Sequence, residues 1–161
     1  MLQTGTTAPD FTLFSNTREK VSLAGLRGKT VVLAFFPAAF TGVCEKELCS
    51  FRDSLANLNE LNATVLGIGV DAPFANNAFA QRNNVNFPLL SDYTRDATRA
   101  YDIALDDFAG MPGYTASKRA VYVVDPDGTI QYAWVGPNPG VEPNYEEVNQ
   151  AVAAISNKSA S

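Results

Sequence analysis

Three short apolar runs constrain the fold of this chain more than any other feature. Each is rich in β-branched or aromatic residues and lacks polar alternation; they are Thr30–Phe36, Thr64–Val70 and Ala120–Val124. A strand with one face in water alternates polar and apolar residues, whereas a strand buried on both faces does not. The runs therefore predict the interior of a sheet that is covered by helices.

Two further pairs of segments predict hairpins. The turn Asp125–Gly128, with the sequence Asp-Pro-Asp-Gly, joins the third run to a strand predicted at Thr129–Val135. A short turn of this composition between two β-rich segments is a strong hairpin signal. Near the N-terminus, Phe11–Phe14 and Lys20–Leu23 predict a second hairpin at the edge of the sheet.

Helical patterns fill the gaps between the predicted strands. They cover Cys44–Leu61, Phe74–Arg82, Arg95–Tyr101 and Pro143–Ile155, the last with its proline in the first turn. Residues 157–161 are expected to form a frayed tail. The order of strands and helices predicts an α/β fold with a central mixed β-sheet flanked by helices. A length of 161 residues corresponds to a single domain, 1–161.

The composition excludes several classes of function. The chain has no histidine, which removes Ser-His and Cys-His catalytic pairs and histidine metal ligands, and its two cysteines cannot complete a four-ligand zinc site. A net charge of −5 disfavours nucleic acid and anionic membranes as partners. No membrane-length apolar run and no signal peptide is recognisable, so we expect a cytoplasmic protein whose cysteines are reactive or inert rather than permanently bridged.

One cysteine stands at the predicted start of a helix. Pro37 ends the first apolar run, because proline cannot donate a further ladder hydrogen bond. Thr41 is the expected N-cap of the next helix, which makes Cys44 its third residue. The N–H groups of a first turn lack partners within the helix and carry partial positive charge, so they favour a thiolate, the nucleophilic form of cysteine. The carboxyl end of a central strand is also where open α/β sheets bind ligands.

Helical periodicity separates the two cysteines. At about 100° per residue, Cys44 lies on the apolar stripe that faces the sheet, whereas Cys49 lies about 140° away from it. The other residues of this stripe are Leu48, Phe51, Leu55 and Leu58. In an intact helix the two cysteine Cα atoms would be about 8.7 Å apart, beyond the roughly 6.8 Å limit of disulfides, so a bridge would require the first turns to unwind. The pattern alone does not decide between a nucleophile and an inert buried cysteine.

Pro37, Thr41 and Cys44 together form the pattern P-x-x-x-T-x-x-C. This pattern is similar to the active-site signature of the peroxiredoxins, thiol peroxidases with a thioredoxin-like fold. The resemblance extends along most of the chain, through Gly5–Phe11, Leu89–Asp92 and the arginine-headed segment Arg119–Asp125. Within the family, the spacing of the two cysteines is most similar to the alkyl hydroperoxide reductase E and bacterioferritin comigratory protein groups.

The resemblance implies a role for each matched residue. Cys44 would attack a peroxide and become a sulfenic acid, and Thr41 would offer its hydroxyl to the thiolate and the peroxide. Arg119 would stabilise the thiolate and the charge that develops on the leaving oxygen. Pro37 would shape the pocket. The backbone of Val43 and the residue Phe40 would contact the substrate. The resemblance implies no metal and no organic cofactor.

The resemblance also implies that Cys49 attacks the sulfenic acid and forms a Cys44–Cys49 disulfide, which a thioredoxin-like or other dithiol donor would reduce. Two alternatives stay open: a single-cysteine cycle that uses an external thiol, and a non-enzymatic redox sensor. A thiol-disulfide oxidoreductase is disfavoured, because that class normally carries C-x-x-C and the spacing here is C-x-x-x-x-C. Some peroxiredoxins dimerise through loops that flank the site, where Phe40 and Phe74 are expected, so a homodimer is also open.

A second motif in the sequence suggests a different function, the binding of a dinucleotide. Gly67–Ala72 matches the G-x-G-x-x-A fingerprint of dinucleotide-binding folds. However, both glycines fall inside an apolar run rather than in a loop, and Pro73 follows directly. We therefore expect these glycines to lie in a strand and expect no bound nucleotide.

Overall fold

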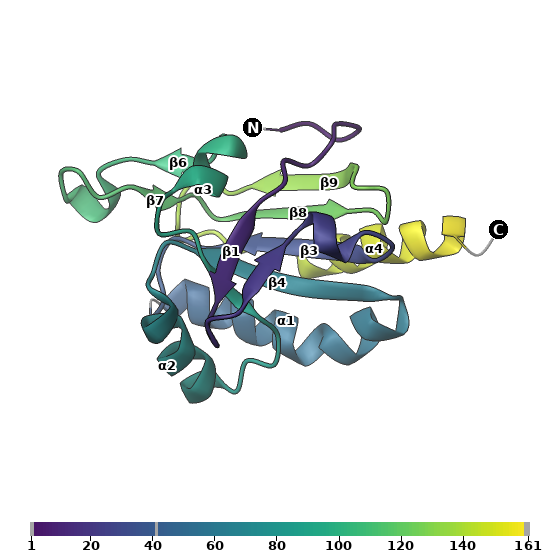
Figure 1. The fold of residues 1–161 in the computed structure, drawn as a ribbon, viewed down its shortest axis with the longest axis horizontal. Helices are drawn as coiled ribbons and strands as arrows, with labels where there is room; N and C mark the ends of the chain where they lie inside the picture. Colours follow the sequence, from purple (N-terminus) through teal and green to yellow (C-terminus); the bar gives the residue numbers. More distant parts are fainter. Residues whose placement is uncertain (1, 41, 160–161) are drawn as a thin grey trace.

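The centre of the molecule is a seven-stranded sheet with the strand order β2-β1-β5-β4-β3-β8-β9 (Figure 1). The structure, a computed structural model, describes residues 2–40 and 42–159. The side chains of six residues lie outside that description: Val43, Cys44, Leu55, Ala56, Lys158 and Ser159. Among the described residues, no helix is both long and apolar enough to cross a membrane.

The three apolar runs form the middle of this sheet, as predicted. They are β3 (Thr30–Phe35), β4 (Ala63–Gly69) and β8 (Ala120–Val124), and nearly all their residues are buried. Strand β3 pairs in parallel with β4 and antiparallel with β8, so the sheet is mixed, as the sequence predicts. Together with the flanking helices, this confirms the thioredoxin-like α/β class.

Both predicted hairpins are present. Strand β8 continues through the turn at Asp125 into β9 (Ile130–Val135), and β1 (Thr12–Ser15) pairs with β2 (Lys20–Ser22) at the opposite edge. The sequence does not predict β5 (Leu89–Ser91), which joins the N-terminal hairpin to β4. The remaining short elements are β6 (Ala104–Leu105), β7 (Ala116–Ser117) and the 3-10 turns η1 (Ala24–Leu26) and η2 (Phe108–Gly110).

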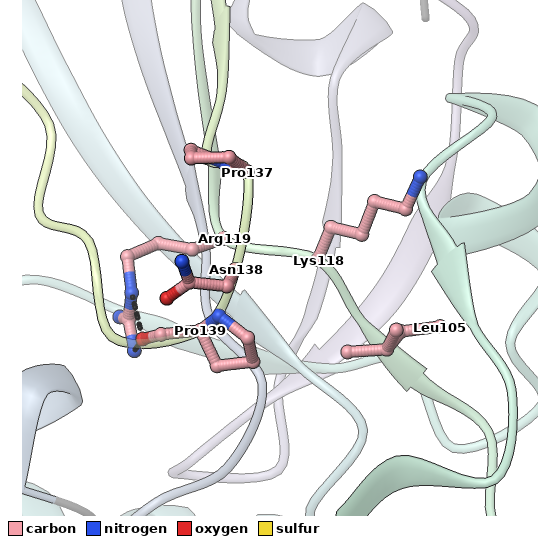
Figure 2. Close-up of a pocket in the computed structure, with 7 residues that line it drawn as sticks. Leu105, Lys118, Arg119, Pro137, Asn138 and Pro139 are labelled. Carbon is pink, nitrogen blue, oxygen red and sulfur yellow. Dashed lines mark hydrogen bonds between the residues drawn. The ribbon is translucent and has the colours of Figure 1, made fainter.

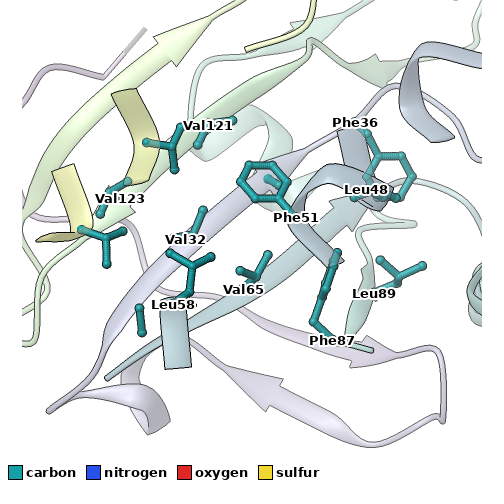
Figure 3. Packing of buried hydrophobic residues seen from close by; sticks show 14 of the residues in the cluster. Val32, Phe36, Leu48, Phe51, Leu58, Val65, Phe87, Leu89, Val121 and Val123 are labelled. Atoms are coloured by element: carbon teal, nitrogen blue, oxygen red, sulfur yellow. The ribbon is translucent and has the colours of Figure 1, made fainter. Parts of the chain in front are cut away.

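Two apolar clusters cover the two faces of the sheet. One face packs against α1 (Gly42–Glu60), α2 (Pro73–Asn83) and α4 (Tyr145–Ser159), and Figure 3 shows its core around Val32 and Phe51. The other face packs against α3 (Asp96–Ala100) and the N-terminal segment. Successive side chains of a strand point to opposite faces, so β3 contributes to both clusters in alternation.

One expectation about the last helix is wrong. Helix α4 begins at Tyr145, so Pro143 lies before it rather than in its first turn. Asn144 is the cap instead, because its Oδ1 accepts a hydrogen bond from the N–H of Glu147 at 3.1 Å. The helix extends to Ser159, so it includes residues 157–159 of the C-terminal segment. Neither glycine nor proline stands there to end it, so the helical hydrogen bonding continues.

The glycines of the dinucleotide-like motif lie inside β4, as expected. A Cβ atom on Gly67 would lie 2.6 Å from Leu89 Cδ2, and one on Gly69 would lie 2.7 Å from the Phe36 ring. Close packing of neighbouring side chains over β4 therefore explains both glycines.

Candidate active site

The strand–loop–helix unit that carries the predicted signature is formed as expected. The Phe36 N–H donates to Ile68 O at 2.9 Å, which keeps the chain on the sheet up to the buried Pro37. Helix α1 then begins at Gly42, so the backbone of Cys44 lies in its first turn. Thr41 and the side chains of Val43 and Cys44 lie outside the described residues.

The rest of α1 follows the predicted stripe. Leu48, Phe51 and Leu58 are buried against the sheet, whereas Cys49 is half-buried beside α2. The Cys49 thiol donates to Asn83 Oδ1, with Sγ 3.9 Å from the oxygen. Because α1 runs unbroken from Gly42 to Glu60, both cysteines belong to one continuous helix.

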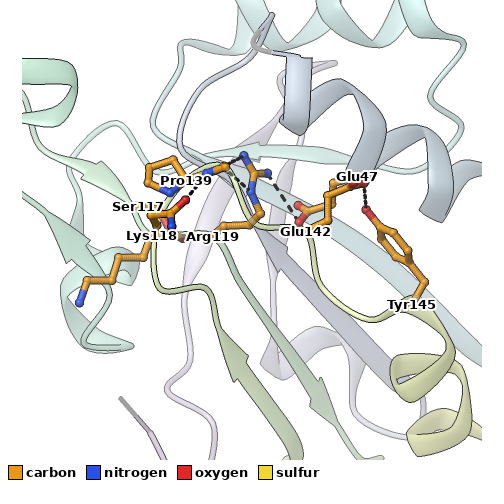
Figure 4. A network of polar contacts seen from close by, with 9 residues as sticks. Glu47, Ser117, Lys118, Arg119, Pro139, Glu142 and Tyr145 are labelled. Carbon is orange, nitrogen blue, oxygen red and sulfur yellow. Dashed lines mark hydrogen bonds and ion pairs between the residues drawn. The ribbon is translucent and has the colours of Figure 1, made fainter.

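Arg119 lies immediately before β8, and its side chain reaches the first turns of α1 (Figure 4). Only 2% of the residue is exposed. Its Nε and Nη2 donate to the carbonyl of Pro139 at 3.1 and 2.9 Å, and its Nη1 lies 3.6 Å from Glu47 Oε2. Arg119 is therefore not an ordinary solvated surface charge, because burying a guanidinium is costly unless partners hold it.

Glu47 is a site residue that the sequence reading did not identify. It is fully buried, one helical turn after Cys44. Burial raises the pKa of its carboxyl from 4.5 to about 8; Arg119 opposes this rise and Glu142 adds to it. The sequence feature that could have identified Glu47 is its position at the edge of the apolar stripe, about 60° from Cys44 on the helix, where an acidic residue is unusual.

Helix α4 contributes to the same polar network. The Tyr145 hydroxyl donates to Glu142 Oε1 at 2.8 Å, and the Tyr145 ring packs edge-on against Phe51 at 5.5 Å between ring centroids. Burial raises the pKa of the Tyr145 phenol, so it remains a neutral hydrogen-bond donor. The start of α4, the segment before it and the first turns of α1 are thus joined around Arg119.

The loop between β3 and α1 is held from the side of α2. The N–H of Ala39 donates to Asp71 Oδ2 at 2.8 Å. Phe40 has a left-handed backbone with φ of 63°, and its ring packs edge-on against Phe79 at 5.2 Å. Burial raises the pKa of Asp71 above its ordinary value, although the Ala39 N–H and Arg95 favour its ionised form.

A cavity of about 380 Å³ adjoins Arg119 (Figure 2). Its other lining residues are Leu105, Lys118, Gly136, Pro137, Asn138 and Pro139. In chemical terms, the arrangement supplies a buried cation beside the first two turns of a helix, whose N-terminal N–H groups also attract negative charge. Such a place stabilises a thiolate or an oxyanion, and the neutral form that burial favours for Glu47 leaves the charge of Arg119 uncancelled by that carboxyl.

Comparison with known proteins identifies the class. Residues 4–133 match the AhpC/TSA family. The chain is 39% identical over 136 residues to alkyl hydroperoxide reductase E of Mycobacterium tuberculosis, which covers 83% of this chain and 85% of that protein. It is 38% identical over 127 residues to the chloroplastic peroxiredoxin Q of Gentiana triflora, which covers 79% of this chain but only 56% of that longer one.

Comparison of the three-dimensional structures leads to the same class of protein. The crystal structure of peroxidoxin BcpB from Mycobacterium tuberculosis superimposes with a TM-score of 0.81 at 28% identity, over 98% of each chain. The chain belongs to the AhpC/TSA family of peroxiredoxins. It is by class a thiol-dependent peroxidase, which confirms the resemblance seen in the sequence.

Proposed function

We propose that this peroxiredoxin reduces hydrogen peroxide and organic hydroperoxides at Cys44, with Arg119 as the cation that stabilises the reacting charges. The observation that carries the proposal is the contact between Arg119 and Glu47. Glu47 follows Cys44 by three positions in α1, and residues with this spacing are neighbours on a helix surface, about 5–6 Å apart at Cβ. The buried guanidinium therefore lies against the helical turn that carries the cysteine.

The first step transfers two electrons from sulfur to the peroxide. The Cys44 thiolate attacks one peroxide oxygen, an S–O bond forms, and the O–O bond breaks. The departing oxygen takes up a proton and leaves as water or an alcohol, and the sulfur becomes a sulfenic acid. Negative charge moves from sulfur to oxygen during this step. A guanidinium fixed in a site of low polarity stabilises that charge more than water would, because the site needs no reorganisation.

The loop residues complete the proposed site. Thr41 offers its hydroxyl to the thiolate and to the peroxide, and the backbone N–H groups of Val43 and Cys44 add further donors. Pro37 shields the sulfur from water, and its buried position supports that role. Phe40 contributes an apolar edge for the organic part of a hydroperoxide.

Cys49 resolves the sulfenic acid in this proposal. Its sulfur attacks the sulfenic sulfur, an S–S bond forms, the S–O bond breaks, and water leaves with the thiol proton. Because α1 is continuous through both cysteines, its first turns must unwind before the bond can form. A thioredoxin-like dithiol then supplies two electrons and two protons and restores both thiols. We place this cycle in the cytoplasm, where such donors are kept reduced.

We also propose that the protein works as a homodimer through the face that carries Phe40 and Phe74. Phe40 is 45% exposed in the loop that Asp71 holds, and Phe74, expected in a loop, is 68% exposed at the start of α2. Exposed aromatic residues grouped on one face are typical of a protein contact surface.

The direct test is the intact mass of the reduced protein after one equivalent of hydrogen peroxide. Loss of two hydrogen atoms supports the Cys44–Cys49 disulfide, and Cys49→Ser should instead gain one oxygen atom. A gain of one oxygen in the unsubstituted protein would favour the single-cysteine cycle. Turnover with a dithiol donor separates an enzyme from a redox sensor.

Cys44→Ser is the matched control, because it keeps Cys49 and removes only the proposed nucleophile. It should show no change of mass within the time that the unsubstituted protein needs for complete oxidation. If Cys44→Ser is oxidised as fast as the unsubstituted protein, Cys44 is not the reacting residue.

A further inference from the structure

A hydrogen bond joins the loop between β3 and α1 to a carboxylate of a different segment. Ala39 lies between Pro37 and the start of α1, and its N–H donates to Asp71 Oδ2 at 2.8 Å. Asp71 lies two residues after the end of β4 and two residues before α2. A hydrogen bond from a backbone N–H to a carboxylate is stronger than one between neutral groups. The active-site loop is therefore tied to the next strand of the sheet.

Asp71 is itself firmly placed. Its carbonyl accepts a hydrogen bond from Ser91 Oγ at 2.6 Å and another from Asn76 Nδ2 at 3.3 Å. Ser91 belongs to β5 and Asn76 to α2, and both residues are buried. The carboxylate thus extends toward the loop from a backbone that side chains of β5 and α2 hold in place.

The loop between β3 and α1 has a strained backbone at Phe40, the residue that follows Ala39. Phe40 has a φ of 63°, a left-handed conformation that is unfavourable for a bulky residue with a Cβ atom. Such a conformation persists only where the surroundings hold it. The edge-on contact of Phe40 with Phe79 and the hydrogen bond of Ala39 to Asp71 are two contacts that do so.

We propose that Asp71 is a positioning residue that latches the active-site loop in its folded form and thereby sets the balance between peroxide attack and disulfide formation. The proposal rests on the function proposed above. Attack on peroxide needs the helix head folded, whereas the Cys44–Cys49 bond needs its first turns unwound. A contact that stabilises only the folded form therefore slows the second step relative to the first.

The latch also affects how readily Cys44 is over-oxidised to a sulfinic acid at high peroxide concentration. A sulfenic acid that is not resolved can attack a second peroxide; a further S–O bond forms, the O–O bond breaks, and a sulfinic acid and water or an alcohol result. A longer-lived folded form gives this reaction more time. Weakening the latch should therefore reduce sulfinic acid formation at Cys44.

Three variants separate the latch from general destabilisation. Asp71→Ala removes the acceptor, and Asp71→Asn keeps an oxygen at the same place. Asn77→Ala is the matched control, because it removes a hydrogen bond between α2 and Asn16 and leaves the contact of Asp71 with Ala39 in place. Hydrogen exchange in peptides from α4 shows whether any variant destabilises the whole molecule.

Hydrogen exchange of the reduced protein is the first measurement, and it does not depend on peroxidase activity. In Asp71→Ala, peptides that cover residues 36–48 should exchange about tenfold faster, the scale of losing one hydrogen bond to a charged group. Asp71→Asn should recover most of the protection, and Asn77→Ala should match the unsubstituted protein. Unchanged exchange in Asp71→Ala, or an equal rise in Asn77→Ala, would overturn the latch.

The second measurement is the fraction of sulfinic acid formed during turnover at high peroxide. Asp71→Ala should form several-fold less of it than the unsubstituted protein, and its disulfide should form faster after one equivalent of peroxide. Faster exchange without either change would overturn the link between the latch and resolution. If the unsubstituted protein does not react with peroxide at all, the proposed function fails, while the exchange experiment still tests the contact of Asp71 with the loop.

Discussion

Arg119 is an arginine with almost no contact with water, so its charge has to be balanced by the protein around it. The Pro139 carbonyl accepts from two of its nitrogens, and Glu47 lies 3.6 Å from the third. Burial disfavours the ionised form of Glu47 more than Arg119 favours it, which raises the carboxyl pKa to about 8. Below that pH the pair keeps a net positive charge, and a thiolate in the same helical turn benefits from it.

Glu47→Gln tests this description of the carboxyl. Between pH 4.5 and about 8 the folded protein holds a proton on Glu47 that the unfolded chain has lost. The stability that this group contributes is therefore fully present below pH 4.5 and is lost progressively as pH rises toward 8. The glutamine variant should lack this fall, as measured by urea unfolding across the range. A variant that instead loses stability relative to the unsubstituted protein as pH rises would mean that Glu47 is ionised in the fold.

At the residue scale, the sequence identifies some members of the site and misses others. Pro37 and Arg119 are predicted members of the candidate site, from their place in the signature and at the head of a strand. Glu47 and Asp71 are missed, because their importance depends on contacts that no local pattern encodes. Glu47 meets Arg119 across 72 positions of sequence, and Asp71 meets Ala39 across 32.

Strand β4 gives a test at the element scale. In Gly67→Ala the new methyl group would lie 2.6 Å from Leu89 Cδ2, in a fully buried part of the sheet. Overpacking of this kind typically costs about 1–3 kcal/mol of unfolding free energy. Gly42→Ala is the control, because nothing lies within 4 Å of its added methyl group and it begins a helix. Equal unfolding free energies for the two variants would contradict the packing described here.

Helix α1 gives a second test at this scale. Oxidation by one equivalent of peroxide should expose the first turns of α1 to solvent, because a Cys44–Cys49 bond does not fit an intact helix. Hydrogen exchange should then rise over residues 42–50 and stay unchanged over the α4 segment 145–157. Cys49→Ser, treated in the same way, should keep its protection. A protected helix head in a protein shown to contain the disulfide would contradict the requirement for unwinding.

Element prediction succeeds where a pattern is long enough to be read. The buried runs of β3, β4 and β8 and the long helix α1 are found within one or two residues of their observed bounds. Strand β5 is missed, because three residues carry no readable period, although it joins two parts of the sheet. The start of α4 is misplaced, because Asn144 rather than Pro143 supplies the cap.

At the scale of the whole molecule, the proposed homodimer is tested at its exposed aromatic residues. In a homodimer built on Phe40 and Phe74, a charged group at Phe74 would be buried without a partner, so Phe74→Glu should shift the species measured by sedimentation toward the monomer. Tyr93→Glu is the control, because Tyr93 is a 50% exposed aromatic residue that is not one of the two that define the proposed face. A monomeric unsubstituted protein, or a Phe74→Glu variant of unchanged mass, would contradict the proposed dimer.

The central claim concerns one charge in the whole molecule, the thiolate of Cys44 held by Arg119 at the head of α1. The most direct measurement is the rate of Cys44 alkylation as a function of pH in a Cys49→Ser background. We expect rapid alkylation below neutral pH, and Arg119→Met should slow it about tenfold or more at pH 6, since removing a nearby opposite charge favours the neutral thiol. Lys118→Met, which removes the adjacent but exposed cation, should leave the profile unchanged. If the pH dependence of Cys44 alkylation is the same with Arg119→Met as in the Cys49→Ser protein that keeps Arg119, the account is contradicted.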